Sequence, residues 1–140
     1  MSKIFFYGLF MDRSLLTEKG LHPEIIGSAM LPDYRIHIGE RATLLRSASS
    51  RAFGIVMELA DPEARALYSD PSVREYMREP VRVERVNTNE VVEAYCYNLP
   101  SELGLTGANP AYATELAQLA EALRFDSAYV DEIASFGEDS

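Results

Sequence analysis

Runs of apolar residues, some continuous and some alternating, predict a domain built mainly of short strands. Residues 3–7 and 52–59 are short apolar runs rich in aromatic and β-branched side chains, which is typical of buried strands. Residues 34–38 alternate apolar and polar side chains, as a half-buried strand does. Gly54, inside the second buried run, predicts a close backbone approach or a bulge.

The pattern between these runs is shorter and more polar. Further strands are expected at 25–30 and 42–45, a turn at Leu31-Pro32-Asp33, and a Ser-rich loop at 46–51. Residues 76–86 and 91–97 predict two strands around a hairpin loop at Asn87-Thr88-Asn89. Pro80 cannot donate a backbone hydrogen bond, so it indicates an edge position or a bulge in the first of them.

Helical signals are few and fall mainly near the end of the chain. Helices are expected over 13–19 after Asp12, from Asp61 to about Tyr68, over 111–123, and over 127–135 after Asp126. A Gly- and Pro-containing connection spans 100–109. This order predicts one α+β domain over residues 1–136, a curled mixed β-sheet or partial barrel flanked by helices, with a disordered tail at 137–140.

Composition and charge narrow the function classes. The 140 residues include 13 basic and 22 acidic side chains, a net charge of −9, which argues against nucleic-acid and anionic-membrane partners because both attract positive patches. No apolar run approaches the roughly 20 residues of a spanning helix, and no signal peptide is expected. Cys96 is the only cysteine, and there are two histidines, so neither a disulfide nor a metal site is expected and a cytoplasmic location fits.

Several stretches together resemble a known family. They are Tyr7-Gly8-Leu9-Phe10-Met11 after the first strand, "GSAMLPDYRIHI" from Gly27, "AFGIVMEL" from Ala52, "LYSDPSVREYMREPVRV" from Leu67, and "NPAYATELAQLAEALRFDSAYVDEI" from Asn109. In this order and spacing they are similar to the γ-glutamylcyclotransferase-like (AIG2-like) family. The resemblance covers most of the chain and implies that family's fold.

The resemblance also implies a chemistry. The α-amine of a γ-glutamyl compound attacks its own γ-carbonyl, and the amide splits with release of 5-oxoproline. The amine is tethered to its target, so proximity supplies much of the rate. A carboxylate must take a proton from the ammonium and return one to the leaving amine. Backbone N–H groups of a Gly-containing loop can stabilise the oxyanion, and no cofactor is needed.

The family's substrate loop corresponds to Tyr7, Gly8, Leu9 and Phe10. Leu9 and Phe10 stand where the family usually has polar residues, so they offer backbone donors but no polar side chains. A tight turn after the strand is the structural alternative for this stretch. Tyr76 and Tyr112 match residues of the family that line the pocket, with packing in a core or at a helix start as their alternatives.

Two residues are candidates for the catalytic carboxylate. Counting back six residues from Tyr76, the family's Glu corresponds to Asp70, followed by Pro71. Asp70 is one methylene shorter than Glu, and Asp-Pro-Ser is also a common turn. Glu75 is the rival carboxylate. If either is the base, partial burial is expected to raise its pKa towards neutrality.

Two functions therefore remain open. The chain is either an enzyme cleaving a small γ-glutamyl substrate, or a catalytically inactive small-molecule-binding or interaction protein on the same fold. The apolar pair Leu9-Phe10 also fits a subunit contact in a homodimer.

Overall fold

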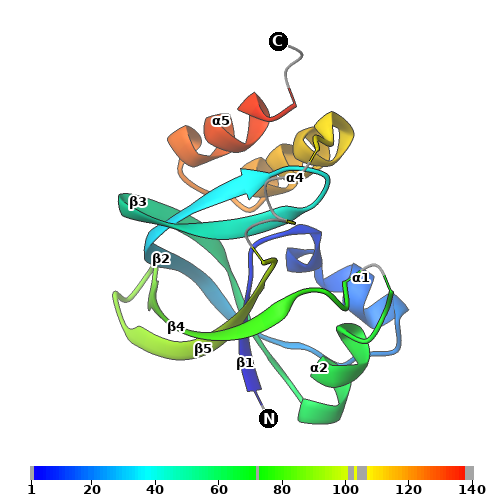
Figure 1. The fold of residues 1–140 in the computed structure, drawn as a ribbon. Coiled ribbons are helices and arrows are strands. Elements are labelled where there is room, and N and C mark those ends of the chain that lie inside the picture. Colours follow the sequence, from blue (N-terminus) through cyan, green and yellow to red (C-terminus); the bar gives the residue numbers. More distant parts are fainter. Residues whose placement is uncertain (1, 72, 101–102, 104–106, 138–140) are drawn as a thin grey trace.

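A closed five-stranded barrel forms the centre of the protein (Figure 1). The computed structural model describes residues 2–71, 73–100, 103 and 107–137. The strand order around the barrel is β1-β3-β2-β4-β5. The strands are β1 (Ser2–Phe6), β2 (Glu24–Ile38), β3 (Ala42–Leu59), β4 (Met77–Arg85) and β5 (Val91–Asn98). The predicted α+β class with a curled mixed sheet is confirmed, and the sheet closes.

The long β2–β3 pair differs from the prediction. Leu31-Pro32-Asp33 is not a turn between two strands: it lies inside β2, where the register with β3 shifts between Pro32 and Tyr34. Asp33 there has φ of 64°. The Ser-rich residues 46–51 are not a loop either, because they continue β3. The residues with turn chemistry thus form a bulge in a continuous ladder, and the chain reverses at residues 39–41 instead.

The seam between β1 and β5 closes the barrel. These two strands pair in parallel, with Ile4 opposite Tyr95, whereas all the other pairs are antiparallel. Pro80 lies in the part of β4 that pairs with β5, while β4 meets β2 only at Glu84 and Arg85. The predicted edge position of Pro80 is therefore confirmed, since its missing N–H interrupts no ladder on the β2 side.

Gly54 allows the backbones of β1 and β3 to approach closely. A Cβ built on Gly54 would lie 2.3 Å from the carbonyl oxygen of Phe6 and 2.8 Å from Cζ of Phe5. Real Cβ atoms do not come so near a backbone oxygen, so only glycine fits there. The close approach predicted at this position is confirmed.

Helices cover two sides of the barrel. The turn η1 (Leu9–Met11) and helix α1 (Arg13–Glu18) follow β1, and α2 (Asp61–Leu67) follows β3. Helices α4 (Pro110–Ala122) and α5 (Ser127–Ser135) pack on each other beside β2 and β3 (Figure 1). Their apolar faces bury Leu116, Tyr129 and Ile133 against the core.

The predicted helices are all present, with small changes at their starts. Asp12 caps α1 by accepting the Ser14 N–H at 3.0 Å. Asp61 is the first residue of α2 rather than its cap, and Asp126 precedes α5 without a side-chain capping bond. Of the predicted tail, residues 138–140 lie outside the described residues. Gly137 is described, and its N–H donates to the Ala134 carbonyl at 2.9 Å.

Candidate functional site

A cavity of about 360 Å³ lies at the mouth of the barrel where β1 and β5 end and β3 and β4 begin. We call it the aromatic cavity, because half of its lining residues are aromatic. Those rings are Phe5, Phe6, Tyr7, Phe10, Tyr68, Tyr76, Tyr97 and Tyr112. The remaining lining residues are Gly8, Leu9, Leu15, Glu40, Arg41, Ala42, Val73 and Asn109. The structure thus brings together all six residues predicted to bind substrate, from three separate parts of the chain.

A buried hydrogen-bond network below the cavity holds Tyr7 in place. The single proton of the Tyr7 hydroxyl is shared between the Tyr97 carbonyl at 2.5 Å and Oδ1 of Asn98 at 2.9 Å. Asn98 also accepts the Leu44 N–H at 3.2 Å and donates through Nδ2 to Glu79 at 3.0 Å. One amide therefore links strands β3, β4 and β5 to the residue that precedes Gly8, which fixes where the loop begins.

Tyr112 reaches across from α4 to the loop after β1. Its hydroxyl accepts the Leu9 N–H at 3.4 Å, and it lies 2.7 Å from where a Cβ on Gly8 would be. Asn109 positions Tyr112 by accepting its N–H at 3.1 Å at the start of α4. Gly8 thus makes room for the Tyr112 hydroxyl, and a backbone donor of the loop faces the cavity.

Stacked and edge-on rings make one wall rigid. Tyr68 stacks on Tyr97 with ring centroids 3.6 Å apart and planes at 10°. Phe10 meets Tyr68 edge-on at 6.3 Å and Phe6 edge-on at 6.1 Å. The Phe10 side chain is therefore half-buried against other rings rather than projecting into solvent.

Burial keeps the tyrosines of the cavity neutral. It raises the pKa of Tyr112 to about 12, a rise that the hydrogen bond from Leu9 opposes. Burial is also the main reason why the pKa values of Tyr7, Tyr68 and Tyr76 lie above their usual value, with neighbouring tyrosines adding to the rise. Their hydroxyl groups therefore act as hydrogen-bond donors and acceptors at neutral pH.

Two charged residues of the β2–β3 turn stand on the cavity lining. Arg41 pairs with Glu75 at 3.0 Å, and its guanidinium lies 5.9 Å from the centroid of the Tyr76 ring. The Glu40 side chain packs against Gly107: its Cδ lies 3.0 Å from where a Cβ on Gly107 would be. Of the residues that the structure describes, Arg41 is the only cation and Glu40 the only carboxylate on this lining.

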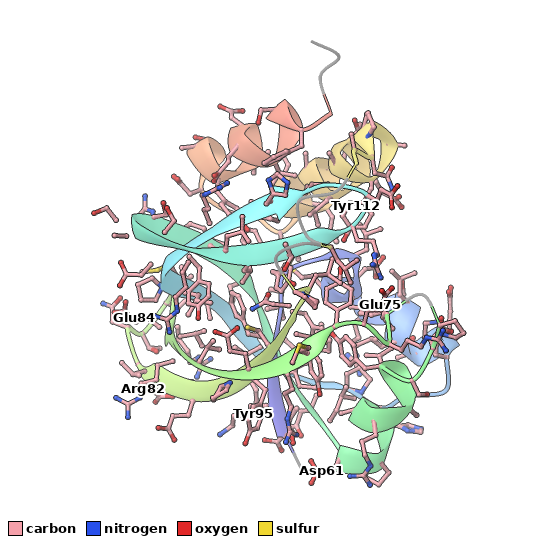
Figure 2. The ribbon with its side chains drawn as sticks, viewed as in Figure 1. Asp61, Glu75, Arg82, Glu84, Tyr95 and Tyr112 are labelled. Carbon is pink, nitrogen blue, oxygen red and sulfur yellow. The ribbon has the colours of Figure 1, made fainter. Side chains whose placement is uncertain are left out.

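The two predicted carboxylates lie outside the lining. Asp70 is exposed, and its carbonyl accepts the N–H groups of Val73 and Arg74 at 3.0 and 2.9 Å. Glu75 is also exposed and makes the ion pair with Arg41. In Figure 2, Glu75 lies on the same side of the molecule as Tyr112. Of this segment, Val73 and Tyr76 reach the cavity.

Sequence reasoning missed several residues of the site. Tyr68 and Tyr97 make the stacked wall, Asn98 holds Tyr7, and Glu40 and Arg41 bring charge. Tyr97 and Asn98 end a strand that was predicted, but nothing local marks them as cavity residues. Only the pairing of distant strands brings them to the loop after β1.

The remaining reactive groups lie elsewhere. Cys96 is fully buried in the barrel, and burial raises the pKa of its thiol to about 12. His22 contacts Glu63 at 3.0 Å on the surface, and His37 meets the Phe136 ring edge-on at 5.4 Å. Within the described part of the chain, no group of three or more potential ligands is placed to hold a metal ion. No described helix is long and apolar enough to cross a membrane.

Comparison with known proteins agrees with this fold. Residues 4–115 match the family profile described as gamma-glutamyl cyclotransferase, AIG2-like. That match covers more than half of the chain, so the chain belongs to this family. A search of curated proteins found no match.

Solved structures share the fold at low sequence identity. A structure titled gamma-glutamyl cyclotransferase is 14% identical with a TM-score of 0.75, over 94% of this chain and 85% of that one. YkqA from Bacillus subtilis is 17% identical with a TM-score of 0.78, over 97% of this chain but only 54% of its own. An AIG2-like protein from Mus musculus is 18% identical with a TM-score of 0.58, over 76% of this chain and 85% of that one.

Proposed function

We propose that the protein binds a small γ-glutamyl amide in the aromatic cavity and cleaves it, releasing 5-oxoproline by attack of the substrate's own α-amine. The observation that supports this best is the convergence of the loop from Tyr7 to Phe10 with Tyr76 and Tyr112 on one cavity. The family resemblance alone predicts these residues, and they come from distant parts of the chain. A shared cavity is what a common ligand requires.

The loop is proposed to bind the glutamyl half. The Leu9 N–H now donates to the Tyr112 hydroxyl at 3.4 Å, a long bond that a substrate oxygen can replace. An oxyanion there would gain a backbone donor, and the neutral Tyr112 hydroxyl could donate to it as well. The loop's apolar side chains then pack in the wall and leave recognition to its backbone.

Proton transfer is proposed to fall to Asp70, with Glu75 as the alternative. A carboxylate must come within hydrogen-bond reach of the substrate ammonium, directly or through one water. Asp70 lies outside the cavity lining, so this role requires the Asp70 carboxylate to approach the substrate ammonium on binding. Val73, in the segment that follows Asp70, already lines the cavity.

Binding without cleavage is the second candidate. The exposed positions of Asp70 and Glu75 favour it, because an exposed carboxylate at the edge of a site is a poor partner for a buried ammonium. In that case the family fold is retained as a small-molecule-binding protein. We further propose that the protein acts in the cytoplasm. A homodimer formed through Leu9 and Phe10 would require both of these half-buried side chains to turn outward.

Release of 5-oxoproline from a panel of γ-glutamyl compounds tests the proposal. Wild-type protein, Asp70→Asn and Asp70→Glu are compared, with Glu75→Gln for the alternative. Release by wild type that is lost in Asp70→Asn supports cleavage through Asp70. Release gained only in Asp70→Glu, or absent from every variant that still binds the compounds, supports binding without cleavage.

A further inference from the structure

We propose that Arg41 is a specificity-determining residue that binds a carboxylate on the amine half of the ligand. The aromatic cavity would then take γ-glutamyl derivatives of large apolar amino acids in preference to γ-glutamyl derivatives of the corresponding simple amines. This inference rests on the proposed function for the γ-glutamyl half. It requires binding, and it holds whether or not cleavage follows.

The first observation is the distribution of charge on the cavity lining. Among the described lining residues, Arg41 is the only side chain that attracts an anion. It comes from the β2–β3 turn, far in sequence from the loop that receives the glutamyl half. A guanidinium binds carboxylates through paired N–H donors in a fixed plane, which makes it selective for that group.

Neighbouring side chains fix the guanidinium before any ligand arrives. Glu75 accepts from Nη1 of Arg41 at 3.0 Å, and the Tyr76 ring lies 5.9 Å from Cζ. The Tyr76 hydroxyl donates to the Ala42 carbonyl at 2.5 Å, so the ring itself is tied to the start of β3. An arginine held in this way loses little conformational entropy when it binds an anion.

The orientation of the ligand follows from exposure. The Arg41 side chain is 29% exposed and its partner Glu75 is 46% exposed, so the pair stands at the open end of the cavity. The leaving amine must face that end to depart. The carboxyl group of Glu40, on the same lining, packs beside Gly107.

The apolar interior supplies the second half of the specificity. Phe10, Tyr68 and Tyr97 form the packed wall, and apolar side chains such as Leu15 and Val73 complete it. A phenyl or large aliphatic group gains by leaving water for such a surface, whereas a polar chain does not. An apolar amino acid combines this group with the carboxylate that Arg41 requires.

Matched ligands test the inference. Binding is measured by titration calorimetry with glutaryl-phenylalanine and glutaryl-2-phenylethylamide, which lack the attacking amine and differ in one carboxylate. Wild type is expected to bind the acid about tenfold more tightly, the range of a charge-assisted hydrogen bond. Arg41→Gln should abolish the preference, and Glu75→Gln should keep or increase it because a competing acid is removed.

Arg46→Gln is the matched control, because Arg46 also lies over a ring, at 5.5 Å from the Tyr34 centroid, but outside the cavity lining. Equal affinities in wild type, or equal losses on both ligands in Arg41→Gln, would overturn the inference.

Release of 5-oxoproline from the γ-glutamyl versions of both ligands is measured in parallel. If the protein prefers the acid but releases no 5-oxoproline, the role of Arg41 is supported and the proposed cleavage is wrong. If it releases 5-oxoproline but shows no preference for the acid, the cleavage is supported and the role of Arg41 is wrong. Failure to bind both ligands, together with no release of 5-oxoproline, overturns the inference and the proposed function.

Discussion

Oδ1 of Asn98 accepts a hydrogen bond from the hydroxyl of Tyr7 at 2.9 Å, in the interior of the barrel below the aromatic cavity. The same amide bonds to the Leu44 N–H and to the carboxylate of Glu79. Asn98, at the end of β5, therefore forms hydrogen bonds to residues of β3 and β4 and to Tyr7, and the position of the loop after β1 depends on these bonds.

Replacing Asn98 should cost both stability and loop geometry. Asn98→Leu leaves the Leu44 N–H and one oxygen of Glu79 without their partner, so we expect the free energy of unfolding to fall by about 2–4 kcal/mol. Urea denaturation measures this directly. Asn87→Leu in the exposed β4–β5 hairpin is the control, and a loss there as large as that at Asn98 would contradict the network's role.

Asn98→Asp tests the same contact through pH. The new carboxylate faces that of Glu79, and their repulsion raises the pKa of the introduced carboxyl group in the folded state. A raised folded pKa gives stability that is present at low pH and lost as the pH rises through it. The variant should therefore approach wild-type stability near about pH 4 and fall behind it near about pH 7. A deficit that does not change with pH would contradict this reading.

Gly8 and Tyr112 should be coupled. Gly8→Ala places a Cβ 2.7 Å from the Tyr112 hydroxyl, so the ring must move and the Leu9 N–H loses its acceptor. We expect a loss of about 1–3 kcal/mol. Tyr112→Phe removes the clashing oxygen, so the double variant should be more stable than the sum of the single losses predicts. Strict additivity would show that the two residues do not touch in solution.

Gly54→Ala should be far more damaging than Gly20→Ala. The Cβ at residue 54 meets the carbonyl oxygen of Phe6 at 2.3 Å, and a backbone atom in the barrel cannot move aside. We expect about 3 kcal/mol of destabilisation or failure to fold. Gly20 has φ of 83° with open space around it, so Ala there costs only about 1–2 kcal/mol of backbone strain. Thermal or urea denaturation of both variants gives the comparison, and equal losses would contradict the close approach.

The buried tyrosines predict a loss of stability at alkaline pH. The pKa of Tyr112 is raised to about 12, and those of Tyr7 and Tyr68 are raised well above the usual value, mainly by burial. In the unfolded chain they ionise near about pH 10. The free energy of unfolding should therefore be intact below about pH 10 and decline above it, by about 1.4 kcal/mol per tyrosine for each unit of raised pKa. The part of the tyrosinate absorbance that these three residues contribute, measured as the difference from their Phe variants, should rise together with unfolding, and its appearance in a still-folded protein would contradict this.

Much of the fold was predictable from local patterns. The apolar run at 52–59 and the hairpin at 87–89 are local signals, and the structure has strands and a turn there. Leu31-Pro32-Asp33 carries turn chemistry but forms a bulge, because pairing of β2 with β3 on both sides outweighs the local preference. The Ser-rich residues 46–51 remain strand for the same reason.

The cavity was predictable only in part. Family resemblance identified the loop from Tyr7 to Phe10, because its glycine and aromatic residues are adjacent in sequence. Tyr97 and Asn98 become neighbours of that loop only through the parallel meeting of β1 and β5, which no sequence pattern predicted. Arg41 lies in the short connection between the strands predicted at 34–38 and 42–45, and nothing local marks it as a cavity residue.

Ligand binding at the loop after β1 is tested most directly by NMR, with the backbone amide of Leu9 observed during titration with glutaryl-phenylalanine. This ligand keeps the carbonyl and carboxylate of a γ-glutamyl compound but lacks the attacking amine, so it cannot be cleaved. We expect saturable shifts of the Gly8, Leu9 and Phe10 amides, because a ligand oxygen replaces the Tyr112 hydroxyl at Leu9. If the ligand binds to saturation without shifting these three amides, or does not bind at all, then this loop does not receive a γ-glutamyl ligand.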